Sequence, residues 1–149
     1  MTGVIQQALD LEVPARTAYD QFTQFLDFPR FVPVLREAEQ IDDTHVRWRA
    51  ELGDEVVASE WEICEQIPDK RIAWKSVGGA RNSGVVTFHR IGDGQSRIML
   101  QVDVDASAPR ARAAQAIDEQ LVNFKRFVEE RGKATGGWRG TILSKDDRV

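Results

Sequence analysis

Apolar and polar residues alternate along the first part of the chain, from residue 4 to residue 13. A period of two residues is typical of a half-buried β-strand. The apolar phase of the alternation consists of Ile5, Leu9, Leu11 and Val13. Pro14 stands where the first turn of a helix tolerates a proline, and Ala18, Phe22 and Phe25 follow it at helical spacing. Residues 26–33 hold two prolines among large apolar side chains, so we expect a kinked turn or a second small helix there.

From residue 37 onward the period changes to two and stays there for about seventy residues, with a turn signal roughly every ten, as in an antiparallel meander. Residues 45–52 form the clearest strand, because Val46, Trp48 and Ala50 share a phase opposite charged residues. The predicted strands are 37–42, 45–52, 55–65, 71–77, 85–91 and 96–106. Between the fourth and fifth of these we expect a loop that contains Gly78, Gly79, Asn82 and Gly84.

The last regular element begins near Pro109 and ends near Gly132, which are favoured residues for the start and the end of a helix. An apolar stripe runs along it and consists of Ala113, Ile117, Leu121, Phe124 and Val128. Such a helix must pack on an apolar surface, and the only candidate is the face of the sheet. The pattern therefore predicts an α+β domain with one antiparallel sheet, two short helices after the first strand, and one long C-terminal helix.

Length and composition narrow the class of protein. A chain of 149 residues suits one compact domain, and its apolar runs fall far short of the roughly 20 residues that span a bilayer. The N-terminus lacks the basic region and apolar core of a secretion signal, and Cys64 is the single cysteine, so we expect a cytoplasmic protein without a disulfide. The net charge of −4 argues against binding to nucleic acid.

Several segments resemble one known fold family, and their order and spacing make the resemblance more specific than any of them alone. They are Leu11–Tyr19 with its proline after the first strand, the aromatic-proline-aromatic turn of Phe25–Phe31, and the segments Trp61–Ile63, Pro68–Trp74 and Gly84–Phe88. Together they resemble the SRPBCC/START-like superfamily, and within it the bacterial polyketide cyclase/dehydrase-like proteins. The resemblance implies a helix-grip fold, in which a curved antiparallel sheet of seven strands wraps around the long helix. We expect this domain to cover residues 1–132, followed by a C-terminal tail of residues 133–149 that also looks like one in bacterial members.

The usual working site of that family is a cavity between the concave face of the sheet and the long helix. The residues that the pattern directs there are Trp48, Trp61, Trp74, Phe88, Leu100, Val102, Ile117, Leu121 and Phe124. Three indoles on one face suit a planar or isoprenoid ligand, although they could equally fill the core. Ser59 and Ser76 share the inward phase and could bind a ligand carbonyl or the backbone, and Tyr19 could reach the mouth of the cavity or pack on the edge of the sheet.

Residues for catalysis or metal binding do not form a recognisable set. His45 and His89 fall in outward phases, and with Cys64 they lack the spacing of metal ligands, so we expect no metal and no cofactor. No serine or cysteine has the surroundings of an activated nucleophile. We therefore expect a protein that binds a small hydrophobic molecule such as a lipid, quinone or polyketide. The alternatives are a polyketide aromatase/cyclase-type enzyme and an interaction module with a filled cavity; the pattern carries no information on oligomeric state.

Overall fold

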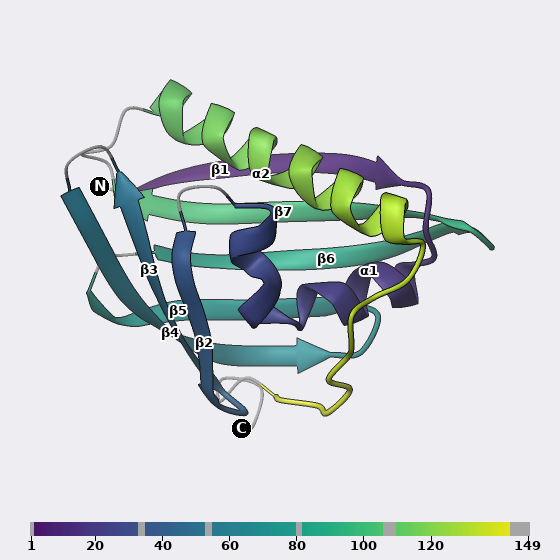
Figure 1. Ribbon diagram of the computed structural model, residues 1–149, viewed down its shortest axis with the longest axis horizontal. Coiled ribbons are helices and arrows are strands. Elements are labelled where there is room, and N and C mark those ends of the chain that lie inside the picture. The colour runs from purple at the N-terminus through teal and green to yellow at the C-terminus, as the bar shows by residue number, and fades with distance from the viewer. Residues whose placement is uncertain (1, 33–34, 53–54, 80–81, 106–109, 144–149) are drawn as a thin grey trace.

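The fold is a single curved sheet with three helices on one of its faces (Figure 1). The computed structural model describes residues 2–32, 35–52, 55–79, 82–105 and 110–143. The helices are α1 (Ala15–Phe22), the 3-10 helix η1 (Phe25–Arg30) and α2 (Arg110–Arg131). The strands are β1 (Thr2–Leu11), β2 (Leu35–Asp42), β3 (His45–Leu52), β4 (Glu55–Ile67), β5 (Arg71–Gly79), β6 (Asn82–Gly92) and β7 (Gln95–Asp105).

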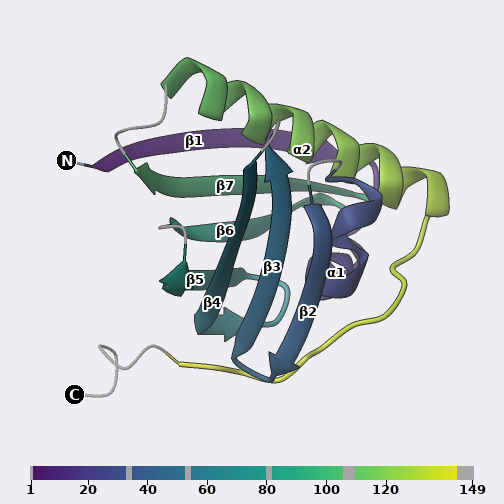
Figure 2. The ribbon, with the colours of Figure 1, turned by 60° about the vertical axis from the view of Figure 1, so that its left-hand side comes forward.

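The seven strands form one sheet in the order β1-β7-β6-β5-β4-β3-β2, and all neighbours pair antiparallel. The six consecutive strands β2 to β7 therefore form a meander, and β1 extends it by pairing with β7. α2 packs on β1 and runs along β1 and β7 in both ribbon views (Figures 1 and 2). This arrangement confirms the predicted α+β, helix-grip fold.

The sheet bends strongly at β4. The pairing of β4 with β5 shifts between Glu60 and Trp61 and again between Ile63 and Glu65, and such bulges bend a strand and increase its twist. As a result, β2, β3 and the first part of β4 cross steeply over the direction of β6 and β7 (Figure 2). The concave face that this bend creates is the face on which the helices lie.

The glycine-rich region between the fourth and fifth predicted strands is the main correction to the expected elements. β5 continues to Gly79 and β6 begins at Asn82, so residues expected in a loop belong to strands. Gly84 lies inside β6, opposite Trp74 of β5 and Val102 of β7. A glycine there reflects close packing by a neighbouring side chain, described below, and not a turn.

The predicted apolar stripe of α2 faces the sheet. Ile117, Leu121, Phe124 and Val128 are all buried, while the side chain of Ala113 lies outside the described residues. Gly132 has a φ of +68°, and its N–H donates to the carbonyl oxygen of Val128 at 2.9 Å, so it ends α2 in the left-handed conformation that glycine adopts freely. No helix among the described residues has the length and apolar character needed to cross a membrane.

Residues 132–143, called here the C-terminal segment, descend from the end of α2 past α1 to the far end of β4 (Figure 1, yellow). The N–H of Thr135 donates to Oε1 of Gln21 at 2.9 Å, and the N–H of Trp138 donates to Oγ1 of Thr23 at 3.0 Å. Ile142 then exchanges two backbone hydrogen bonds of 2.8 Å with Gln66. These contacts attach the C-terminal segment to both α1 and β4; the rest of the expected tail, 144–149, lies outside the described residues.

Candidate functional site

Three tryptophans form a continuous aromatic row across the concave face of the sheet. Trp48 of β3 packs edge-on against Trp61 of β4, with ring centroids 6.0 Å apart and an angle of 72° between the planes. Trp61 in turn stacks on Trp74 of β5 at 4.9 Å and 20°. The structure thus brings together the three indoles that the sequence pattern placed on one face.

The strand register explains why the row runs diagonally. Trp48 lies opposite Ser59, which precedes Trp61 by two residues, and Trp61 lies opposite Ser76, which follows Trp74 by two residues. Neighbouring tryptophans are therefore offset by two residues along their strands and do not stand directly opposite one another. This diagonal offset lets the rings pack side by side. The row ends at Gly84, where a β-carbon would lie 2.6 Å from Cζ2 of Trp74.

Phenylalanines from α1 and η1 fill the region between the end of this row and α2. Phe22 is the centre of the cluster: its ring lies 6.5 Å from Trp74, 6.0 Å from Phe88 and 5.8 Å from Phe124. Phe31 extends the cluster to Phe124 at 5.5 Å and to Phe127 at 5.3 Å. Phe22 and Phe31 were not among the candidate residues, although the helical spacing of Phe22 placed it on an apolar face.

The remaining apolar candidates lie on the α2 side of this cluster. Phe88 of β6, Leu100 and Val102 of β7, and Ile117, Leu121 and Phe124 of α2 are all at least nine-tenths buried and belong to one core with Phe22. The candidate residues thus form two groups. The buried group lies between β6, β7 and α2, and the tryptophan row lies on β3, β4 and β5.

Burial differs along the tryptophan row. Trp74 is 6% exposed, whereas Trp48 and Trp61 are only partly buried although they face the concave side. The ring nitrogens of Trp48 and Trp61 are nevertheless enclosed, and neither has a hydrogen-bond partner among the described residues. Part of each of these two tryptophans is therefore accessible, whereas their N–H groups are not.

The polar candidates have different environments. Ser59 is 3% exposed and its Oγ donates to the carbonyl oxygen of Gly78 at 3.1 Å, which is the backbone alternative that the sequence left open. Ser76 is half-buried beside Trp61 in the register of β4 and β5. Both serines make further interactions, so neither is a free group.

Tyr19 is completely buried and does not reach the surface. Its ring packs edge-on against Phe88 at 5.5 Å, and the guanidinium of Arg139 from the C-terminal segment covers the ring at 5.7 Å. Burial raises the pKa of Tyr19, while the Gln66 side chain and the charge of Arg139 oppose that shift. The phenol therefore stays protonated at neutral pH beneath the C-terminal segment.

Titratable groups do not gather at the tryptophan row. The buried polar side chains among the described residues are Gln21, Thr23, Ser59, Glu65, Gln66 and Ser96, and the only charged one, Glu65, pairs with Arg71 at 2.6 Å. A search of the described residues finds no group of three or more histidine, cysteine or carboxylate side chains that could hold a metal ion. His45, the first residue of β3, pairs with Asp42, the last residue of β2, at 2.9 Å across the turn between these strands.

A surface pocket of about 270 Å³ lies where η1 meets the C-terminal half of α2. Its lining residues are Arg30, Phe31, Asn123, Arg126, Phe127 and Glu130, none of which was a candidate. The guanidinium of Arg30 lies 4.9 Å from the centre of the Phe127 ring. This pocket is separate from the concave face that carries the tryptophan row.

Comparison with known proteins gives a consistent family. Residues 11–127 match the family described as polyketide cyclase / dehydrase and lipid transport. An uncharacterized 17.2 kDa protein of Streptomyces lincolnensis is 39% identical over 147 residues, which cover 93% of this chain and 98% of that protein.

Two solved structures show the same fold. The Zhui aromatase/cyclase of a Streptomyces species superposes with a TM-score of 0.70 at 14% identity, covering 93% of this chain and 100% of that one. A START superfamily protein from Mycobacterium smegmatis also gives 0.70, at 12% identity and over 86% and 95% of the two chains. At these identities the likeness concerns the fold alone.

Proposed function

Because the chain belongs to the polyketide cyclase/dehydrase and lipid transport family, we propose that it binds a small hydrophobic molecule between the concave face of the sheet and α2, within the cytoplasm. One observation carries the proposal. Trp48 and Trp61 point to the inner side of the sheet, yet they are only partly buried, while the apolar residues around Phe22 are tightly enclosed. Large apolar rings left accessible on an inner face suit a ligand that buries them on binding.

The arrangement of the helices supports this location. α2 runs along β1 and β7, and its apolar stripe packs against the buried group of residues (Figures 1 and 2). The inner face of β3 and β4 lies beyond α2, at the side where the sheet bends. A ligand bound there would contact Trp48 and Trp61 directly, with the Phe22 cluster as the rigid inner wall.

Binding fits the described residues better than catalysis by an aromatase/cyclase-type enzyme. Three of the buried polar side chains already have structural partners: Ser96 Oγ donates to the Val13 carbonyl at 2.8 Å, Gln21 contacts Thr135, and Glu65 pairs with Arg71. General acid–base chemistry needs a proton donor or acceptor within hydrogen-bonding reach of the substrate. The groups just named are engaged elsewhere, so we propose binding or transport of the ligand and not its chemical conversion.

The test is a fluorescence titration of the wild-type protein and of Trp61→Ala with N-phenyl-1-naphthylamine, a neutral apolar fluorophore, which measures the dissociation constant of the fluorophore. We expect the dissociation constant to rise about tenfold or more in the variant, because the lost indole removes a large part of the apolar contact surface. Val56→Ala is the matched control, since Val56 is on the same strand but 62% exposed. Equal affinity in Trp61→Ala and wild type would reject the proposed site.

Native mass spectrometry of the protein purified from its own host complements the titration. A retained neutral lipid, quinone or polyketide, lost from Trp61→Ala but kept by Val56→Ala, would support binding at the tryptophan row. A ligand retained equally by both variants would place binding elsewhere.

A further inference from the structure

The surface pocket between η1 and the C-terminal half of α2 carries positive charge on a protein whose net charge is −4. On the side of η1 its lining is Arg30 and, directly after that helix, Phe31. The lining residues from α2 lie three or four positions from one another, so they share one face of that helix, and they are Asn123, Arg126, Phe127 and Glu130. The volume of about 270 Å³ is slightly below the ~300–1,000 Å³ of sites for drug-sized ligands, so the pocket suits a small molecule.

Two phenylalanine rings form the apolar part of this lining. Phe31 is 7% exposed, and its ring lies 5.5 Å from that of Phe124 and 5.3 Å from that of Phe127. Phe127 is only partly buried, so part of its surface remains available for contact. Because Phe31 belongs to the buried core, the two rings present a fixed surface that suits an aromatic ligand.

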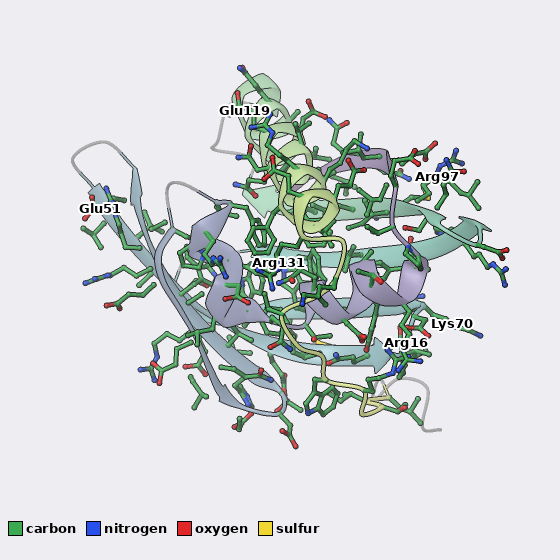
Figure 3. The ribbon with its side chains drawn as sticks, turned by 45° about the vertical axis from the view of Figure 1, so that its right-hand side comes forward. Arg16, Glu51, Lys70, Arg97, Glu119 and Arg131 are labelled. Carbon is green, nitrogen blue, oxygen red and sulfur yellow. The ribbon has the colours of Figure 1, made fainter. Side chains whose placement is uncertain are left out.

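Three arginines lie at or beside the pocket. The Cζ atom of Arg30 lies 4.9 Å from the centre of the Phe127 ring and that of Arg131 lies 5.7 Å from it; Figure 3 shows Arg131 at the end of α2, beside η1. A guanidinium that stacks on a ring keeps the N–H groups of its edge available for hydrogen bonds. Arg30 approaches the carboxylate of Asp27 only to 3.7 Å, and Arg126 forms no ion pair with any of the described residues. Both guanidiniums therefore retain donors for an anion.

We propose that this pocket binds a small planar aromatic carboxylate, whose carboxylate accepts hydrogen bonds from Arg30 and Arg126 while its ring contacts Phe31 and Phe127. The site is separate from the concave face of the sheet, so the inference does not depend on the proposed function. Arginine binds a carboxylate through two parallel N–H bonds. Two arginines against the single carboxylate of Glu130 leave one positive charge in the lining, which matches a monoanion better than a phosphate dianion.

The experiment titrates 2-naphthoate into ¹⁵N-labelled protein and obtains the dissociation constant from the shifts of the amide resonances of residues 123–130. We expect it to rise about tenfold in Arg30→Gln and in Arg126→Gln, because each loses a charge-assisted hydrogen bond. Glu130→Gln should bind about threefold more tightly, since it removes a carboxylate that repels the ligand. Arg16→Gln is the matched control: it removes the same charge from a side chain that is 70% exposed and lies outside the pocket, so its affinity should equal that of wild type.

Three further probes on the wild-type protein test the class of ligand. The neutral 2-naphthamide, acetate without a ring, and inorganic phosphate should each bind at least tenfold more weakly than 2-naphthoate, and higher salt should weaken the binding of naphthoate because the arginines are exposed. Equal dissociation constants in Arg126→Gln and Arg16→Gln would mean that naphthoate binds elsewhere, and the inference would be overturned. Weaker binding to Glu130→Gln, or phosphate that binds as tightly as naphthoate, would overturn the assignment of an aromatic monoanion.

Discussion

Gly84 lies directly against the indole of Trp74: a β-carbon at Gly84 would approach Cζ2 of Trp74 to 2.6 Å and the carbonyl oxygen of Gln101 to 2.9 Å. The clash involves both a packed ring and backbone, so neither neighbour can yield easily. We expect Gly84→Ala to destabilise the fold by about 1–3 kcal/mol, as overpacked cores do. Urea unfolding followed by far-UV circular dichroism measures this change.

Gly78→Ala is the control for that prediction, because nothing lies within 4 Å of a β-carbon at Gly78. This substitution should change the free energy of unfolding by less than about 0.5 kcal/mol. Equal losses at both glycines would mean that strand conformation, and not the indole of Trp74, sets the requirement.

Arg139 holds the C-terminal segment to two other elements. Its guanidinium contacts Asp20 of α1 at 2.6 Å and Asp69 of the β4–β5 turn at 2.8 Å, and it is only 32% exposed. We expect Arg139→Ala to cost about 1 kcal/mol, less at high salt because such pairs are screened. Arg90→Ala should cost close to nothing, since Arg90 and its partner Asp93 are both largely exposed. Identical denaturation midpoints for the two variants would contradict this prediction.

Phe22 joins the tryptophan row to the α2 side of the core through its contacts with Trp74, Phe88 and Phe124. Phe22→Ala should lower the free energy of unfolding by about 3–5 kcal/mol, because it removes a large buried ring and leaves a cavity. Leu26→Ala is a suitable comparison, as Leu26 is 72% exposed and should be nearly neutral. A loss below about 1.5 kcal/mol for Phe22→Ala would show that the neighbouring rings repack around the gap.

His45 and Asp42 form a pair whose titration can be followed directly. The hydrogen bond that the ring N–H of His45 donates to the carboxylate of Asp42 raises the pKa of His45, and the same contact lowers the pKa of Asp42. The stabilisation from His45 is complete below its ordinary pKa of about 6.5 and disappears as the pH rises through the raised value. In Asp42→Asn, the imidazole resonances of His45 should titrate at a lower pH than in wild type; an unchanged midpoint would show that the pair does not persist in solution.

The sequence predicted the regular elements where the pattern was strict. The strand at 45–52 and the long helix ending before Gly132 are found as expected, because alternation and capping are local properties of the chain. The sequence around Gly84 predicts a loop, and the structure differs there for the opposite reason. A glycine has no side chain that marks a phase, and the ring it accommodates belongs to another strand, so local sequence does not distinguish a turn from a close contact.

The sequence predicts which residues face the concave side of the sheet, but it does not predict how their side chains contact one another. The inward phase of Trp48, Trp61 and Trp74 follows from alternation, yet their diagonal contact depends on strand register and on the bulges of β4. Those features involve pairs of strands and leave no mark on one strand alone. Likewise, the pattern placed Phe22 on an apolar helix face, but only the packing of α1 between β6 and α2 brings it to the centre of the aromatic cluster.

The match to the known family ends at residue 127. The C-terminal segment lies beyond this point, and it makes hydrogen bonds to Gln21, Thr23 and Gln66. An expression boundary chosen from the family alone would therefore expose polar groups of α1 and the end of β4, together with the covered ring of Tyr19. A shortened chain of that kind should be treated as a different folding unit, and binding data obtained on it would not describe the intact protein.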